Sequence, residues 1–245
     1  SGEKRFVVKR NVDVPIQDEI ISTKVTLDYL GGSFDRSYFV NEELKYGNFN
    51  IGIAPQYQLT QDDLTLNLGV SLFYLNNIES GDNDIFIYPN ITASYRLVDE
   101  LLIAYGGIEG GLIQNSYENF VDENPFVSPT LFITPTDQQY NVHAGIKGKL
   151  SNSMSYNVNA RYFADRSRAL FKSNAVFSDA TEDYQMGNSY NVVYDDLKTF
   201  AFSGELSVDV NRNFKLGAKA EFFAYNTKDA SEPWNLPDIT GSLFV

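Results

Sequence analysis

The sequence predicts an all-β protein: an antiparallel up-and-down transmembrane β-barrel of about ten strands, with short periplasmic turns and long extracellular loops. Three observations support this fold class. Apolar and polar side chains alternate strictly, the alternating runs reach about 12 to 14 residues, and the links between runs are short and long in turn. Together they indicate strands long enough to cross a bilayer.

The alternation is clearest in residues 64–74. Every second position there is apolar, and four of the five positions between hold Thr65, Asn67, Gly69 and Ser71. Successive side chains of a strand point to opposite faces, so this strand has one apolar and one polar face. Strands of soluble proteins usually end near five or six residues, whereas roughly nine to eleven tilted residues cross a bilayer. The pattern therefore indicates lipid on one face and water on the other.

Five strands are expected in the first half of the chain, over residues 21–30, 46–59, 64–74, 85–97 and 101–113. The last of them alternates poorly, and its glycines indicate a bend, a bulge or the close approach of another segment. Residues 1–20 are interpreted as an N-terminal periplasmic segment or an extra strand. Residues 21–245 are expected to form the outer-membrane β-barrel.

Five more strands are expected over residues 140–150, 156–162, 200–209, 214–222 and 239–245. Tight turns are expected at residues 60–62, 98–100, 151–152 and 211–212, where Asp or Asn can close a turn. Long links are expected over residues 31–45, 75–84, 114–139, 163–198 and 226–237. In outer-membrane barrels short turns and long loops alternate along the chain in this way, whereas the geometry of a sandwich does not require this alternation. Because the first and last strands each adjoin a long link, both chain ends are expected on the periplasmic side.

Composition excludes several classes of protein. The net charge of −13 over 245 residues argues against nucleic-acid binding, which needs clustered Lys and Arg. The absence of Cys excludes disulfides and zinc–thiolate sites. No run approaches the roughly 18 apolar residues of a transmembrane helix. The mean hydropathy of −0.27 is compatible with a barrel, because half of each strand faces a polar lumen.

Aromatic residues on the apolar faces gather near the expected strand ends. Such a placement would form two interfacial girdles around an aliphatic waist. The alternative is the core of a sandwich with aromatic margins. The residues are Tyr57, Tyr74, Tyr95, Tyr140, Tyr156, Tyr162, Phe200 and Phe214.

No catalytic, cofactor-binding or metal-binding residues are expected, and the chain is not predicted to be an enzyme. The single histidine, His143, is interpreted as a hydrogen-bonded interior residue, because no partner for a nucleophile–base pair is apparent. The acidic pairs at residues 182–183 and 195–196 are interpreted as solvated loop charge. Residues 81–84 resemble the opening of a calcium loop, but Phe86 and Ile87 interrupt the pattern, which favours a turn.

Charged side chains are expected to line the lumen on consecutive strands. Opposite charges on neighbouring strands can pair across the wall and fill a narrow lumen. A substrate- or ion-selective lining is the alternative, although open channels generally need about sixteen strands. The expected lumen residues are His143, Lys147, Lys149, Arg161, Glu205, Asp209, Lys215, Lys219 and Glu221.

The links over residues 114–139 and 163–198 are expected to carry whatever binding specificity the chain has, because rigid strands hold such loops in place. They are rich in aromatic side chains, which must pack into the barrel mouth, on one another, or against a partner. Packing into the mouth is the favoured interpretation. The candidate binding residues are Tyr117, Phe120, Phe126, Phe171, Phe177, Tyr184 and Tyr190.

Four short motifs carry a family resemblance: residues 123–129 (ENPFVSP), 144–148 (AGIKG), 190–196 (YNVVYDD) and 234–237 (WNLP). Over most of residues 24–245 the chain resembles TonB-dependent receptor-like outer-membrane β-barrel proteins of Bacteroidota. A complete receptor of this kind has a plug domain and about twenty-two strands. The resemblance therefore implies a barrel portion or a reduced relative without a plug domain.

The resemblance implies a non-enzymatic barrel in the outer membrane of a Gram-negative bacterium, acting in transport or binding. Two alternatives remain: a closed, non-conducting barrel that serves as a scaffold in an envelope assembly complex, and a soluble β-sandwich adhesin or glycan-binding protein. The expected partners are outer-membrane lipid and a possible protein bound through the extracellular loops. No cofactor is expected, and no cargo can be named.

Overall fold

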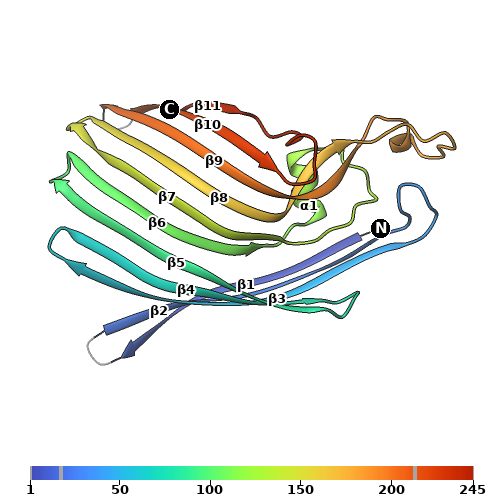
Figure 1. Ribbon diagram of the computed structural model, residues 1–245, viewed down its shortest axis with the longest axis horizontal. Coiled ribbons are helices and arrows are strands. Elements are labelled where there is room, and N and C mark those ends of the chain that lie inside the picture. The colour runs from blue at the N-terminus through green and yellow to red at the C-terminus, as the bar shows by residue number, and fades with distance from the viewer. Residues whose placement is uncertain (1, 17–18, 212–213, 245) are drawn as a thin grey trace.

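The computed structural model describes residues 2–16, 19–211 and 214–244, which form one antiparallel sheet of eleven strands. Each strand pairs with its neighbours in sequence, so the sheet is of the up-and-down type (Figure 1). The predicted fold class is thereby confirmed. The strands are β1 (Gly2–Ile16), β2 (Glu19–Phe34), β3 (Leu44–Gln61), β4 (Leu64–Asn77), β5 (Asn83–Val98), β6 (Leu102–Ile113), β7 (Thr136–Ser151), β8 (Met154–Ser173), β9 (Tyr190–Asn211), β10 (Phe214–Thr227) and β11 (Ile239–Phe244).

Two short helices interrupt the links. Helix α1 (Tyr117–Glu123) lies between β6 and β7, and the 3-10 helix η1 (Asp183–Gln185) lies between β8 and β9. Among the described residues, no helix has the length and apolar character needed to cross a membrane. Residues 17, 18, 212 and 245, which belong to predicted elements, lie outside the described residues.

The register keeps apolar side chains in continuous outer rows. One such row runs from β3 to β10 through Tyr57, Leu68, Ile91, Ile108, Val142, Tyr162, Phe200 and Ala224. Many large apolar side chains in these outer rows are solvent-exposed, and Ile85 reaches 75%. The outer surface of the sheet is therefore an apolar band.

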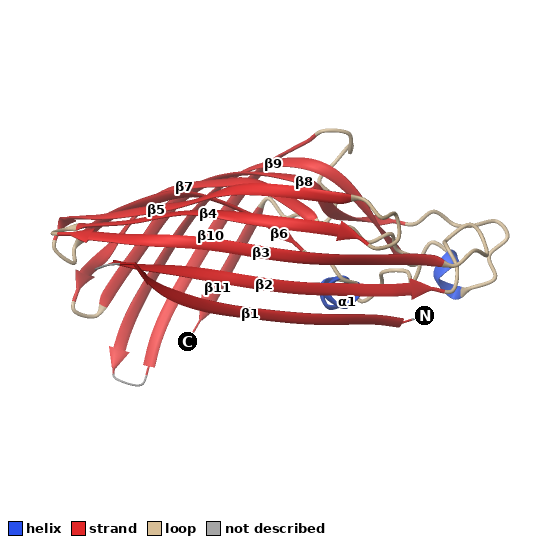
Figure 2. Cartoon of the chain, turned by 90° about the horizontal axis from the view of Figure 1, so that it is seen from below, coloured by secondary structure: helices blue, strands red, loops and turns tan. Residues whose placement is uncertain are grey.

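The opposite face is polar over the middle of the sheet. The cross-strand row adjacent to the apolar row just described holds Gln58, Asn67, Thr92, Gly107, His143, Arg161 and Ala201. Polar side chains such as Asn50, Thr199 and Ser203 are buried on this face. The sheet curls strongly (Figure 2), and α1 contacts both β2 and β8 from this side. A helix can touch strands so far apart in the sheet only from its concave side, so the polar face is the concave one.

The links follow the predicted parity. Tight turns join β3 to β4, β5 to β6 and β7 to β8, and in the first two Asp62 and Asp99 adopt positive φ values of 50° and 38°. Longer links span residues 35–43, 78–82, 114–135, 174–189 and 228–238 at the opposite end of the sheet. We call these two ends the turn end and the loop end.

One predicted link is much shorter than expected. Residues 163–198 were expected to form a loop, but β8 continues to Ser173 and β9 begins at Tyr190. A register shift between Asp165 and Arg168 breaks the alternation here, and Ser167 has a φ of 52°. The bulge moves the following residues out of phase. The loop-end parts of both strands therefore do not show a regular two-residue alternation in the sequence.

The structure has eleven strands instead of about ten, because residues 2–16 form β1, so the extra strand is the one of the two alternatives for residues 1–20 that the structure shows. Gly2 pairs with Ser33, so the start of β1 lies at the loop end of the sheet. Phe244 pairs with Gly217 near the turn end. The expectation that both ends lie on the turn side is therefore wrong for the N-terminus. Clustered charges and the adjacent Val7 and Val8 blur the alternation of β1 and conceal it in the sequence.

We predict that a charge in an outer row destabilises the membrane-inserted protein more than the same charge on the concave face. Leu68→Arg should lower the free energy of unfolding by about 2–4 kcal/mol, the cost of Arg near the middle of a bilayer. Gln58→Arg is the matched control, because Gln58 is exposed on the concave face one residue from Tyr57, the partner of Leu68. Urea titration in lipid vesicles measures both; equal losses would contradict the assignment of the faces.

Candidate functional site

The loop end of the sheet is crossed by residues 114–135, which we call the mouth segment. Its helix α1 begins at Ser116, whose hydroxyl accepts a hydrogen bond from the Asn119 backbone nitrogen at 3.2 Å. Asn124 ends the helix in an extended conformation, as the residue before Pro125 favours. These local signals produce a helix of only seven residues, with Phe120 as its buried side chain.

Phe120 lies in an apolar cluster that joins two distant parts of the sheet. On one side are residues of β2 and β3, and on the other are residues of β8 and β9, with the Phe120 and Phe171 rings 5.8 Å apart in an edge-on arrangement. The mouth segment is thus packed against both walls of the curved sheet. The cluster comprises Leu30, Phe34, Tyr46, Phe120, Val127, Leu131, Ile133, Phe171 and Val192.

Glu3 of β1 anchors the start of α1. Its carboxylate accepts hydrogen bonds from the backbone nitrogens of Tyr117 and Glu118, at 2.8 and 3.2 Å, and from the Tyr46 hydroxyl at 2.8 Å. A carboxylate at this end of a helix satisfies free N–H groups and complements the helix dipole.

The far side of the mouth segment is joined to β9. The Tyr190 backbone pairs with the segment through a parallel bridge to Val127, with hydrogen bonds of 2.9 Å from Ser128 N to Tyr190 O and from Tyr190 N to Phe126 O. The Tyr194 hydroxyl donates to the Phe132 carbonyl at 3.0 Å and accepts from the Thr134 backbone nitrogen at 3.2 Å. The segment is therefore held at both ends.

Two further links touch one another above the mouth, in a contact that we call the loop clasp. The buried Gln185 donates to the Tyr38 carbonyl at 2.6 Å, and the Tyr38 hydroxyl donates to the Ala175 carbonyl at 3.0 Å. Arg36 pairs with Glu182 at 3.4 Å. The clasp joins residues 35–43 to residues 174–189. It leaves an exposed apolar patch at the loop tips, made of Phe39, Val40, Val176 and Met186.

The structure places the candidate aromatic residues in three settings. Phe120 and Phe171 belong to the apolar cluster, and Tyr117 and Tyr190 pack against it. Phe177 and Tyr184 lie in the clasp, where the Phe177 ring meets Phe39 edge-on at 5.6 Å and the Tyr184 ring lies tilted against Tyr38 at 6.3 Å. Phe126 is 66% exposed.

The candidate lumen residues all fall in concave rows, and most of them meet an opposite charge or a ring. Arg161 and Lys219 both pair with Glu221, at 2.7 and 2.9 Å. His143 lies 4.0 Å from Glu109. Lys147 lies over the Tyr105 ring, 5.4 Å from its centre. Lys149 pairs with Glu100 at 2.6 Å, and the register sets Asp209 opposite Lys215 and Glu205 opposite Lys219.

A cavity of about 270 Å³ opens on the concave face below the mouth segment. Its walls carry Lys24 and Glu109 together with Thr26, Ser71 and Asn90. Within the described ranges, no group of three or more acidic or histidine side chains is arranged to hold a metal ion. The arrangement is suited to hydrogen bonding with a polar molecule, and it contains no pairing of a nucleophile with a base.

Sequence reasoning missed the residues that fix the mouth segment, chiefly Glu3, Tyr46 and Tyr194. One signal was available for Tyr46. It falls on the polar parity of β3, and an aromatic side chain in a polar row indicates that something apolar covers that row. Glu3 carried no such signal, because its partners are distant backbone groups.

No family model and no curated protein matches this sequence. Solved structures of outer-membrane proteins are similar in fold. The pyoverdine outer membrane receptor FpvA from Pseudomonas aeruginosa PAO1 aligns with a TM-score of 0.58 and 13% identity, over 98% of this chain and 38% of the receptor. The FrpB iron transporter from Neisseria meningitidis aligns with a TM-score of 0.59 and 8% identity, over 92% and 36%.

The copper transporter OprC is similar as well, with a TM-score of 0.57 and 12% identity, over 91% of this chain and 38% of the transporter. These likenesses establish the outer-membrane β-barrel fold. This chain spans less than two-fifths of the length of each of these three proteins.

We predict that Glu3→Gln loosens α1 without unfolding the sheet. Neutralising the carboxylate weakens its charge-assisted hydrogen bonds, worth about 1–3 kcal/mol, to the helix start. Hydrogen exchange at the Tyr117 and Glu118 amides should accelerate by at least tenfold while the β9 amides are unchanged. Glu79→Gln, in an exposed link, is the charge-matched control. Unchanged exchange in Glu3→Gln would show that the anchor does not restrain the helix.

We predict that the order of the link over residues 228–238 depends on pH, through the carboxyl group of Asp195 at the loop end of β9. Burial alone would raise the pKa of this carboxyl, but hydrogen bonds from the backbone nitrogens of Asp196, Lys228, Asp229 and Ala230 outweigh it and lower the pKa below the ordinary value. Its stabilising effect is therefore complete above about pH 4, the ordinary Asp pKa, and is lost as pH falls through the lowered pKa.

Acidification should therefore lower the hydrogen-exchange protection factors of the amides at residues 228–230, taken relative to intrinsic exchange at the same pH, before it affects β9. In Asp195→Asn the exchange should be fast already at neutral pH, whereas Asp179→Asn, in the exposed link 174–189, should behave as wild type. Protection factors at residues 228–230 that stay constant in the wild-type chain as the pH falls through the lowered pKa would contradict this account of Asp195.

Proposed function

We propose that this chain forms part of the wall and mouth of a TonB-dependent receptor-like β-barrel in the outer membrane of a Gram-negative bacterium, with a non-enzymatic role in binding or transport. The observation that carries the proposal is the mouth segment, which crosses the loop end of the concave face beneath a set of long links. The apolar outer band and the likeness in fold to outer-membrane receptors support it. A Bacteroidota origin rests on the four motifs alone.

The geometry favours a section of a larger wall. Among the described residues β1 pairs only with β2, and β11 pairs only with β10, so the sheet has two edges. An odd number of antiparallel strands makes β1 and β11 run in the same direction. Joining them directly would need a parallel pair in a sheet that is otherwise antiparallel. We propose that further antiparallel strands of the same barrel meet these edges, since unpaired edges cannot face lipid.

In this proposal the binding surface comprises the loop-tip patch and the mouth. Exposed apolar side chains such as Phe39 and Val176 offer contact area to a ligand or protein partner from outside. Below them the mouth segment narrows the way to the polar concave face. Passage of a solute would require the mouth segment to move from at least one of its two attachments.

A non-conducting scaffold is the second candidate, and one observation favours it. The concave charges are largely paired with one another, as in Arg161 with Glu221, which suits a filled interior. Steady conductance of the complete barrel in a planar bilayer would favour transport, and silence would favour the scaffold. A soluble sandwich is disfavoured. In a sandwich a second sheet would cover the apolar rows, which are exposed in this structure.

We predict that the loop end faces the outside of the cell. The sequence contains no cysteine, so single-cysteine variants give an unambiguous signal. In intact cells a membrane-impermeant maleimide should label Val176→Cys, at the loop tip. Asn152→Cys, in the exposed turn between β7 and β8, should be labelled only after the cells are permeabilised.

Membrane fractions should release both variants with detergent but not with alkaline carbonate. Release without detergent would overturn the proposed membrane location. Labelling of both cysteines in intact cells, or of Asn152→Cys alone, would overturn the proposed orientation.

A further inference from the structure

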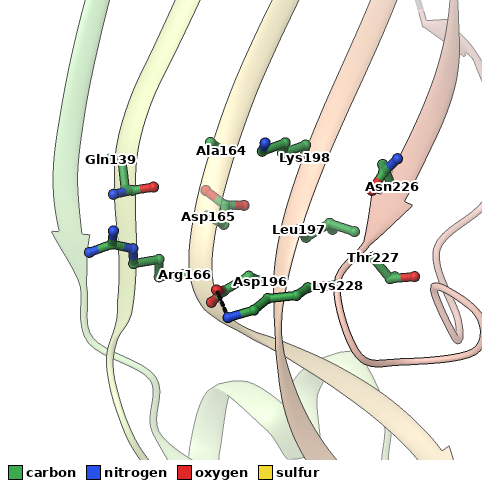
Figure 3. A pocket seen from close by; sticks show the side chains of 10 residues that line it. All are labelled: Gln139, Ala164, Asp165, Arg166, Asp196, Leu197, Lys198, Asn226, Thr227 and Lys228. Carbon is green, nitrogen blue, oxygen red and sulfur yellow. Dashed lines mark hydrogen bonds and ion pairs between the residues drawn. The ribbon is translucent and has the colours of Figure 1, made fainter.

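A second cavity lies on the wall of the sheet, away from the mouth. It has a volume of about 460 Å³ and spans β7, β8, β9 and β10 near the loop end (Figure 3). Its polar lining includes Gln139, Arg166, Asp196, Lys198, Asn226 and Lys228. None of these residues takes part in the mouth or the loop clasp.

The register places this cavity on the outer face. Tyr140, Ala164, Lys198 and Asn226 form one cross-strand row. The next row toward the turn end contains Tyr162 and Phe200, both exposed in the apolar band. Neighbouring rows of one face are two residues apart, or about 7 Å. The cationic side chain of Lys198 therefore stands one row above the aromatic edge of the apolar surface.

The charges of the cavity are only partly balanced. Lys228 pairs with Asp196 at 3.1 Å, so these two neutralise one another. Asp165 also borders the cavity, but its carboxylate is buried and receives a hydrogen bond from Gln138 at 3.1 Å, with Arg168 at 3.9 Å. In the part of the chain that the structure describes, neither Arg166 nor Lys198 has an ion pair.

Gln139 holds the guanidinium of Arg166 in place. With its amide oriented to suit both groups, its oxygen accepts hydrogen bonds from Arg166 Nε and Nη2 at 3.1 and 3.2 Å. In Figure 3 Arg166 lies beside Gln139, and Lys198 lies across the cavity from it. The cavity thus offers two exposed cations, separated by a gap and backed by the amide of Asn226.

We propose that this cavity binds the phosphate headgroup of a lipid in the membrane leaflet at the loop end. The inference rests on the proposed membrane location. Aromatic side chains mark the boundary between lipid tails and headgroups, so Arg166 and Lys198 lie at headgroup depth. A guanidinium forms paired hydrogen bonds with phosphate, and an ammonium adds a point charge. The acyl chains would lie along Tyr162 and Phe200 in the row below.

The test measures lipid binding to the full chain in zwitterionic detergent by native mass spectrometry. The probes are a bisphosphorylated glycolipid (lipid A), the same glycolipid without phosphates, and inorganic phosphate. Wild type should retain the phosphorylated lipid and bind the dephosphorylated one at least tenfold more weakly. The double variant Arg166→Gln/Lys198→Gln should lose at least tenfold in affinity for the phosphorylated lipid, since each contact with a charged group contributes substantially.

Lys45→Gln is the matched control, because Lys45 is an exposed, outer-face lysine at the loop end of β3 that pairs with Glu43 at 3.1 Å. It should bind as wild type. Arg166→Lys should recover part of the affinity of Arg166→Gln, since it restores the charge without the planar fork. Heat-modified gel mobility reports whether each variant is folded.

Three results would overturn the inference: equal binding of both glycolipids, a double variant that binds as wild type, or a loss of equal size in Lys45→Gln. Displacement of the lipid by inorganic phosphate at comparable affinity would show a site for free anions and would overturn the assignment to a lipid. A chain that does not enter membranes would refute the proposed function first. A chain that inserts but does not distinguish the glycolipids would refute only this inference.

Discussion

The structure depends on one constraint: the two-residue period of the side chains must stay in phase across eleven strands. A shift of one residue in any pair would carry apolar side chains to the concave face and polar ones to the outside. The register shifts lie outside the central rows of the sheet, for example between Arg96 and Val98 toward the turn end and between Asp165 and Arg168 toward the loop end. The middle of the sheet therefore remains regular, and the apolar outer band is continuous.

The concave face changes from polar to apolar toward the loop end, and the position of the mouth segment depends on this change. In the middle of the sheet that face is polar and satisfies itself through pairs such as Arg161 with Glu221. At the loop end the same face becomes apolar, with Leu30, Phe34 and Phe171 pointing inward. Apolar surface facing water is unfavourable, and the mouth segment covers it with Phe120 and its neighbours. Glu3 then accepts hydrogen bonds from N–H groups that the start of the short helix leaves free, and Tyr194 accepts one from the Thr134 backbone nitrogen, so the segment is restricted to one position.

The outer face changes from apolar to polar toward the loop end. Above Tyr162 and Phe200 the apolar row gives way to Lys198 and Asn226, and the bulge in β8 brings Arg166 beside them. Arg166 lies within this bulge, so a cation stands at the border of the apolar band. Bulges commonly re-aim side chains in this manner.

The sequence by itself determined the fold class, the parity of the links and the face of each regular strand, because these depend on a local period of two that needs no knowledge of distant residues. It left β1 as one of two alternatives for residues 1–20, and it did not reveal the loop-end parts of β8 and β9, because clustered charge or a bulge interrupts the period. Only the tertiary structure decided the mouth segment, the loop clasp and the cationic cavity. Each brings together residues far apart in sequence, as Glu3 with Tyr117 and Tyr38 with Gln185, and such contacts depend on the curvature of the whole sheet, which no local pattern encodes.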